Sequence, residues 1–171
     1  MESYVKKITP KDVFVTTLDS KEYNFIDVSS SEIVAINKNR PSGNEFMDKL
    51  AELLSLYKMR KVHFYEERMG IKQGTLSHFT KIYSGMMFSE WRNQYIMLAA
   101  KELLLETNDE LQKVGQRLGF SGISTFSRWF VKNQNESPSD WRRRAKRQQA
   151  KQDKELLLKI KQERRIELLT K

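Results

Sequence analysis

The sequence of 171 residues predicts a mainly α-helical protein, in which a linker helix joins two helix-turn-helix units. Apolar residues recur at intervals of three and four along most of the chain, which is typical of helices with one buried face. Glycines fall where such helices would have to turn, and no glycine or proline follows Pro138. We expect a short N-terminal extension with β-strand propensity before the units and a basic helix after them.

The extension, residues 1–43, contains short apolar runs rich in β-branched and aromatic residues at 13–15, 23–28 and 33–36. Polar turns separate the runs and predict a small antiparallel meander. The last run also fits one helical turn capped by Ser31. A packing extension is the preferred interpretation, and docking of a partner protein is the alternative.

The first unit, which opens the predicted domain at 44–145, begins after Gly43. Ser42 and Glu45 have the spacing of a capping box, and a helical apolar stripe follows them. We expect a short helix at 62–69, a turn at 70–73 and a recognition-type helix at 74–83. The stripe of the first helix comprises Phe46, Met47, Leu50, Leu53, Leu54 and Tyr57, and the inward positions of the last helix are Leu76 and Phe79.

A long helix is predicted from Ser89, its cap, to about Leu105. Its 17 residues would span roughly 25 Å at about 1.5 Å per residue. Its inner side comprises Trp91, Tyr95, Leu98, Ala99 and Leu103.

The second unit carries the clearest pattern. Thr107 and Glu110 have capping-box spacing, Gly115 leaves room for a crossing helix, and Gly119 suits a tight helix end. The stripe of this helix is Leu111, Val114 and Leu118, and the next helix carries Ile123, Phe126, Trp129 and Phe130. Ser137, Pro138 and Asp140 then have the order expected at the start of a closing helix.

The run GQRLGFSGISTFSRWFVKNQNESPSDWR resembles the second helix-turn-helix and closing helix of the AraC/XylS family of bacterial transcription regulators. The matching positions are Gly119, Phe120, Ser121, Phe126, Arg128, Phe130, Ser137, Pro138, Trp141 and Arg142. Asn135 stands where the family usually has Gly, and Asn is the next best residue for a left-handed backbone. The resemblance implies binding to double-stranded DNA, with recognition helices in successive major grooves.

The first unit departs from the family at two positions. Glu66 stands where a small residue usually lies at the helix crossing, and Lys72 replaces the Ser that usually caps the recognition helix. Glu66 threatens close packing of the two helices unless its carboxylate points out along the groove between them, and the loss of the cap is expected to cost about 1 kcal/mol. Many relatives also carry an effector-binding jelly roll, which needs about eight strands. Three short runs cannot build one, so no cofactor or effector site is predicted.

The resemblance assigns candidate DNA contacts to the outer faces of the recognition helices. In the second unit they are Ser121, Ile123, Ser124, Thr125, Ser127 and Arg128, and in the first Gly74, Thr75, Ser77, His78 and Lys81. Arg128 could contact guanine or a phosphate. Ile123 could touch a thymine methyl group or pack, and packing is the preferred interpretation. Candidates for phosphate contacts are Lys81, Lys132, Arg142 and Arg143, with helix amino termini at Glu110 and Pro138.

Charge is concentrated at the C-terminal end: residues 139–171 hold 12 Lys/Arg and 5 Asp/Glu, and residues 1–138 hold 19 and 17. A local excess of this kind favours contact with a polyanion. The tail at 146–171 has three interpretations: a DNA-backbone arm, a partner-docking helix and a solvated helix. A coiled-coil dimer has weak support, because the apolar residues keep no steady heptad.

Other functions fit the sequence poorly. With no Cys, two His and no phosphate-binding loop or metal-ligand spacing, an enzyme is not expected. No apolar run suits a membrane span, and a cytoplasmic protein is expected. The predicted partners are double-stranded DNA and, further, RNA polymerase or another regulator. The alternative is a helical protein-interaction module, or a protein of non-specific DNA binding and assembly.

Overall fold

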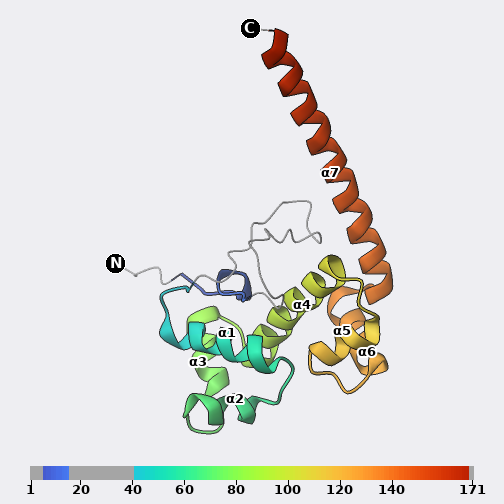
Figure 1. Ribbon diagram of the computed structural model, residues 1–171. Coiled ribbons are helices and arrows are strands. Elements are labelled where there is room, and N and C mark those ends of the chain that lie inside the picture. Colours follow the sequence, from blue (N-terminus) through green and yellow to red (C-terminus); the bar gives the residue numbers. More distant parts are fainter. Residues whose placement is uncertain (1–5, 16–40, 170–171) are drawn as a thin grey trace.

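The computed structural model describes residues 6–15 and 41–169, and every regular element within these ranges is helical (Figure 1). The predicted mainly α-helical fold is therefore confirmed. The elements are η1 (Pro10–Asp12), α1 (Glu45–Tyr57), α2 (Val62–Met69), α3 (Leu76–Ser84), α4 (Phe88–Glu106), α5 (Leu111–Arg117), α6 (Ile123–Gln134) and α7 (Pro138–Leu169).

The linker helix α4 is the centre of the fold. It contacts α1 and α3 on one side, α5, α6 and α7 on the other, and η1 across its surface. From Tyr95 to Leu105 every residue is buried, because neighbours surround this part of the helix. The predicted cap Ser89 is wrong: the helix begins at Phe88, whose ring is buried, and its N-cap is Met87.

The N-terminal segment packs on α4 without forming a strand. Within 6–15 the predicted strand at 13–15 is wrong: Val15 N–H donates to the Tyr95 hydroxyl at 3.1 Å, and the ring of Phe14 lies 5.3 Å from that of Tyr95. Trp91 Nε1 also donates to Ile8 O at 3.1 Å. The backbone therefore bonds to side chains of a helix instead of a neighbouring strand. The runs at 23–28 and 33–36 lie outside the described residues.

Two predicted capping boxes are wrong. The cap of α1 is Asn44, whose side chain accepts from Met47 N–H, while Ser42 donates to Asp48. Thr107 ends α4, since its hydroxyl donates to Leu103 O at 2.6 Å, and α5 begins only at Leu111. At α1, Asn44 takes the cap position from Ser42, whereas at α5 the N-cap is Glu110 and no side chain caps the helix.

The remaining helix predictions are close to the structure. α2 covers the predicted residues, and α1 buries the predicted stripe, with Phe46 and Tyr57 half-buried. Asn135 adopts a left-handed conformation at φ 57°, so it takes the role expected of Gly. Ser137 caps α7 by accepting from Asp140 N–H at 3.1 Å.

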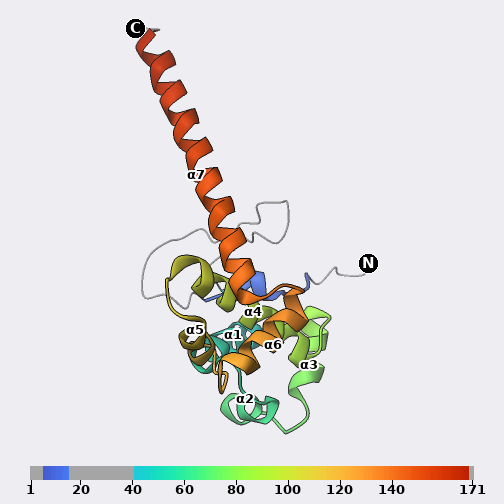
Figure 2. The ribbon, with the colours of Figure 1, turned by 90° about the vertical axis from the view of Figure 1, so that its right-hand side faces the viewer.

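The closing helix α7 starts in the core and ends far from it. Trp141 and Ala145 are buried against the domain, whereas every residue from 150 to 166 is exposed. At about 1.5 Å per residue, its 32 residues reach about 48 Å. Figures 1 and 2 show this helix rising from the side of the domain opposite to the α2–α3 and α5–α6 turns.

Candidate nucleic-acid interface

The outer face of α6 carries the side chains predicted for the second unit. Its inner face is fixed by Phe126 and Phe130, which are fully buried among Phe120, Trp129 and Trp141. Ser121, Ser124, Thr125 and Arg128 are consequently exposed, and Ser127 is half-buried. The structure thus presents the predicted residues on one accessible surface.

Two details of this surface bear on contact chemistry. Ile123 is 44% exposed, so the expectation that it packs is wrong: the first turn of α6 extends beyond the edge of the core. Arg128 Nε donates to Ser124 O at 3.3 Å, a bond within its own helix. The guanidinium therefore stays on the exposed face, where its fork can reach a base or a phosphate.

The outer face of α3 in the first unit carries fewer side chains suited to base contacts than that of α6. Gly74 is exposed with φ +83°, and Thr75, the N-cap of α3, donates its hydroxyl to Lys72 O. His78 and Lys81 are exposed, and Ser77 is half-buried. His78 and Arg128 each lie two residues after the buried residue that anchors their helix, Leu76 or Phe126.

Glu66 caps α3 from the preceding helix. Its Oε1 accepts from Gly74 N–H at 2.8 Å and from Leu76 N–H at 3.1 Å, and the residue is only 2% exposed. The expectation that this carboxylate points out along the groove is wrong. Lys72 leaves the start of α3 without the usual cap, and Glu66 supplies the missing acceptor.

Side-chain sizes explain how the two units tolerate different residues at the helix crossing. In the second unit, a Cβ on Gly115 would lie 3.0 Å from Phe126 Cβ and 3.3 Å from Phe126 Cγ, so the close crossing favours glycine there. In the first unit, the equivalent of Phe126 is Leu76, and Thr80 follows four residues later. These smaller side chains leave room for Glu66.

The two units are held together by a backbone contact as well as by α4. Met59 N–H, between α1 and α2, donates to Leu118 O at 3.0 Å. Gly119 lies directly against Met59, with φ +86°. The start of α2 therefore sits beside the α5–α6 turn of the other unit.

Two exposed cations lie at this junction, Arg60 and Lys61, and neither was predicted as a DNA contact. Arg92 Nη1 donates to Arg60 O at 2.6 Å and anchors the segment to α4, and burial lowers the pKa of Arg92. The signal was hidden because it depends on the contact between the units, which no sequence spacing reveals.

The predicted phosphate residues divide into two groups. Lys132, Lys81 and Arg143 are exposed. Arg142 has a different role: Nε donates to Leu104 O at 3.0 Å and Nη2 to Asp109 O at 2.7 Å, which ties α7 to the α4–α5 connection. These bonds turn its guanidinium into the fold.

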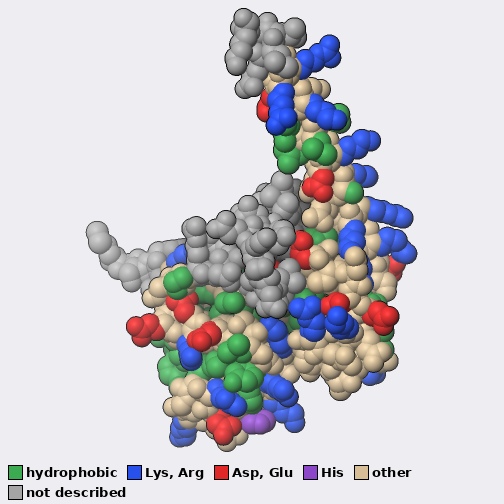
Figure 3. Space-filling view, viewed as in Figure 1, with side chains coloured by type: hydrophobic (Ala, Val, Ile, Leu, Met, Phe, Trp, Pro, Cys, Tyr) green, Lys and Arg blue, Asp and Glu red, His purple; other side chains and the backbone are tan. Residues whose placement is uncertain are grey.

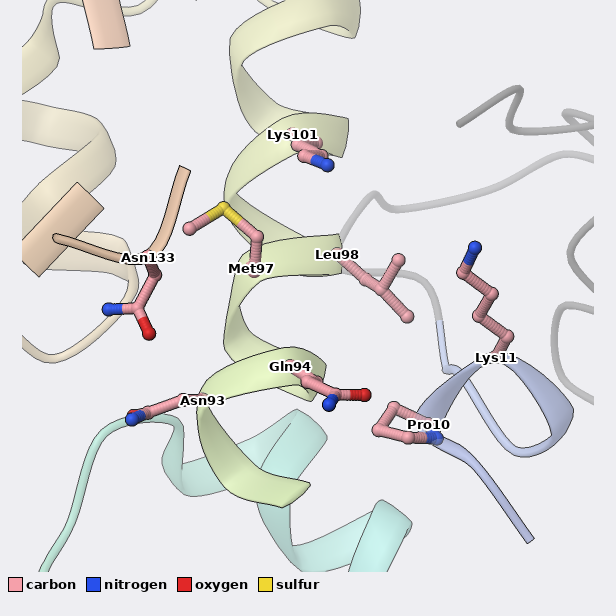
Figure 4. Close-up of a pocket in the computed structure, with 8 residues that line it drawn as sticks. All are labelled: Pro10, Lys11, Asn93, Gln94, Met97, Leu98, Lys101 and Asn133. Carbon is pink, nitrogen blue, oxygen red and sulfur yellow. The ribbon is translucent and has the colours of Figure 1, made fainter. Parts of the chain in front are cut away.

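A pocket of about 170 Å³ lies between η1, α4 and α6 (Figure 4). Its lining side chains leave α4 in different directions: Met97 extends toward Asn133, and Leu98 toward Pro10. The volume is below the roughly 300 Å³ at which ligand pockets usually begin. At this volume the pocket is a groove between packed elements.

The exposed part of α7 is basic. Between 146 and 166 it carries eight Lys or Arg and three Asp or Glu, and these cations flank the projecting helix in Figure 3. Its first cation, Lys146, bonds to Thr107 O and Asn108 Oδ1. Among the described residues, no helix is long and apolar enough to cross a bilayer.

Comparison with known proteins finds a family match over the two units. A helix-turn-helix domain family matches residues 65–144. The chain is 30% identical over 88 residues to YobQ of Bacillus subtilis (strain 168), an uncharacterized HTH-type transcriptional regulator. That match covers 47% of this chain and 36% of YobQ, so the chain spans little more than a third of its relative.

Solved structures share the fold. The DNA-binding domain of AdpA, a global transcriptional factor whose structure is in complex with a target DNA, has a TM-score of 0.54 at 19% identity, covering 60% of this chain and 94% of that one. The C-terminal domain of the response regulator yesN from Fusobacterium nucleatum gives 0.50 at 24% identity, covering 57% and 93%.

Proposed function

We propose that residues 65–144, which match a helix-turn-helix domain family, form a DNA-binding domain of the AraC type, and that the chain is a sequence-specific regulator of transcription that binds double-stranded DNA. Its recognition helices α3 and α6 would enter successive major grooves. A regulator of this kind acts on chromosomal DNA in the bacterial cytoplasm, and RNA polymerase or another regulator is its further proposed partner.

The observation that carries this proposal is the common orientation of the two units on α4. The α2–α3 and α5–α6 turns lie along the same edge of the domain in both ribbon views (Figures 1 and 2). Successive major grooves on one face of B-DNA are separated by about 34 Å. Because the Met59–Leu118 bond adds a second connection beside α4, both helices approach a duplex as one body.

Within this interface, the second unit supplies most of the sequence readout. Arg128 is the best candidate for a bidentate contact with guanine, and Ile123 is exposed enough to meet a thymine methyl group. The first unit offers His78 and small polar groups, so it contributes less discrimination. DNA shape would supply part of the remaining specificity.

Exposed cations position the domain on the backbone. Lys81, Lys132 and Arg143 are accessible, and Arg60 and Lys61 lie at the junction between the units. In a domain that spans two grooves, the junction faces the DNA backbone between them. Phosphate contacts of this kind supply affinity without base preference.

The tail of α7 is better suited to another partner than to the same duplex. It rises from the side opposite to the two helix-turn-helix turns, so its cations move away from the recognition helices. Of the three interpretations of the tail, docking to a partner or a solvated helix is therefore favoured over a DNA-backbone arm. The chain acting only as a helical protein-interaction module remains the second candidate function.

Hydroxyl-radical footprinting on a bound duplex tests the proposal. A regulator with two docked helices protects two backbone segments, about one helical turn apart, on one face of the DNA. An Arg128→Ala variant should weaken protection chiefly at one of them. A protein that binds without a footprint, or that loses all binding at modest salt, would favour the protein-interaction module.

A further inference from the structure

The start of α3 differs from that of α6 in the charge placed there. Helix amino termini carry partial positive charge and unpaired N–H groups, which attract phosphate. At α3, the carboxylate of Glu66 takes the N–H groups of Gly74 and Leu76. At α6, the N-cap is Gly122, and no side chain caps the helix.

Glu66 has a second unusual feature. The residue is only 2% exposed, and its Oε2 is buried without a hydrogen-bond partner. A cap alone needs one acceptor oxygen, which Ser or Gln could also supply. The buried negative charge is therefore more than capping requires, and it lies at the end of the helix that approaches DNA.

We propose that Glu66 is a positioning residue that sets how the first unit docks, in two ways. Its Oε1 fixes where α3 starts, and its charge excludes a DNA phosphate from that helix end. The inference rests on the proposed DNA-binding function. It explains how the domain can seat α3 in a groove by its side chains, while the backbone is held by the second unit and the junction.

Two variants distinguish the fixing of the α3 start from the exclusion of phosphate. Glu66→Gln keeps an acceptor oxygen for Gly74 and Leu76 but removes the charge. It should bind a duplex selected by the wild-type protein about two- to tenfold more tightly at low salt, because the repulsion between the carboxylate and the DNA phosphates is removed. Its base preference should stay unchanged, and its salt dependence should become steeper.

Glu66→Ala removes both the acceptor and the charge, so α3 should lose its fixed start. Base preference should then blur in the half of the site read by α3 and stay sharp in the half read by α6. Glu66→Ala with Lys72→Ser restores a capping hydroxyl without the charge. Because Lys72→Ser also removes a cation, the double variant is compared with Lys72→Ser alone: it should recover the preference and bind more tightly than that single variant, and it serves if Glu66→Gln does not fold.

Glu67→Gln is the matched control, since Glu67 is exposed on the same helix and the substitution removes the same charge. It should change affinity less than Glu66→Gln. Equal gains in both variants would assign the effect to net charge and overturn the inference. A Glu66→Gln protein with wild-type melting temperature and unchanged affinity would overturn it too. Absence of specific binding by the wild-type protein would instead contradict the proposed function, and the inference with it.

Discussion

Gly119 of the α5–α6 turn lies directly against the backbone of Met59, which precedes α2 in the other helix-turn-helix unit. A Cβ on Gly119 would approach Met59 N to 3.1 Å and Met59 O to 3.2 Å. Met59 N–H also donates a hydrogen bond to the carbonyl of Leu118, the residue before Gly119, and this bond holds the two backbones together. The glycine that ends one helix thus also sets the distance between the units.

Gly119→Ala should lower the free energy of unfolding by about 2–4 kcal/mol. Its φ of +86° costs an alanine about 1–2 kcal/mol, and the contact with Met59 forces a backbone shift in addition. Gly70→Ala is the control, because Gly70 has φ +65° but no neighbour within 4 Å of the added Cβ. Denaturant unfolding should therefore give Gly70→Ala the smaller loss, and equal losses would remove the role of the contact.

Arg142→Ala and Arg143→Ala should separate stability from DNA affinity. Loss of the two bonds from Arg142 to Leu104 O and Asp109 O should cost about 2–3 kcal/mol of unfolding free energy. Arg143 is exposed, so its removal should change stability by about 0.5 kcal/mol or less and reduce the salt slope of DNA binding by about one. A stable Arg142→Ala protein with a reduced salt slope would mean that Arg142 contacts a DNA phosphate, as the sequence predicted.

Arg128→Ala should relax base preference at one position and cost about 1–3 kcal/mol of binding free energy. Folding should be unaffected, because the side chain is exposed and bonds only to Ser124 O of its own helix. His78→Ala, at the equivalent position of α3, should have a smaller effect on preference. Binding energies measured across single-base variants of the site test both, and equal effects would contradict the predicted dominance of the second unit.

Deletion of residues 151–171 should leave both stability and the salt slope nearly unchanged on a duplex limited to two major grooves. Residues 151–166 of the removed part are exposed, and α7 leaves the domain on the side opposite to the helix-turn-helix turns. Lys146 is kept because its Nζ bonds to Thr107 O and Asn108 Oδ1. A slope that falls by two or more would mean that the tail reaches the bound duplex.

Stability should rise between pH 7 and pH 9 through Lys58. Burial lowers the pKa of Lys58 from 10.5 to about 8. As the pH rises from 7 to 9, the folded state therefore loses this proton while the unfolded state still holds it. Unfolding free energy therefore increases with pH in that window, by about 1 kcal/mol from pH 7 to pH 9. Lys58→Met should abolish this increase, and denaturant unfolding at the two pH values measures it.

The sequence predicted the helical fold well, because helix periodicity and the motif around Phe126 and Phe130 depend on short spacings. Gly115 was expected at a close crossing and lies there. Helix starts were harder to predict. At Ser42 and Thr107 the spacing of a capping box was present, but Asn44 caps α1 instead, and Thr107 bonds back to Leu103 O at the end of α4.

Features that depend on contacts between distant segments could not be predicted from spacing. Glu66 and Lys72 looked like two separate defects, whereas in three dimensions Glu66 replaces the cap that Lys72 lacks. Arg142 looked like a phosphate ligand until its bonds to Leu104 and Asp109 became visible. The strand predicted at 13–15 failed because Tyr95 and Trp91 satisfy that segment from α4.

The most direct test of the account is selection of random duplexes by the purified protein near physiological salt, with Arg128→Ala beside it. An enriched motif should span two successive major grooves, with stronger preference in the half read by α6. The Arg128→Ala protein should lose preference within that half only. Recovery of no motif, or of a motif confined to one groove, would contradict the conclusion that both units read DNA as one body.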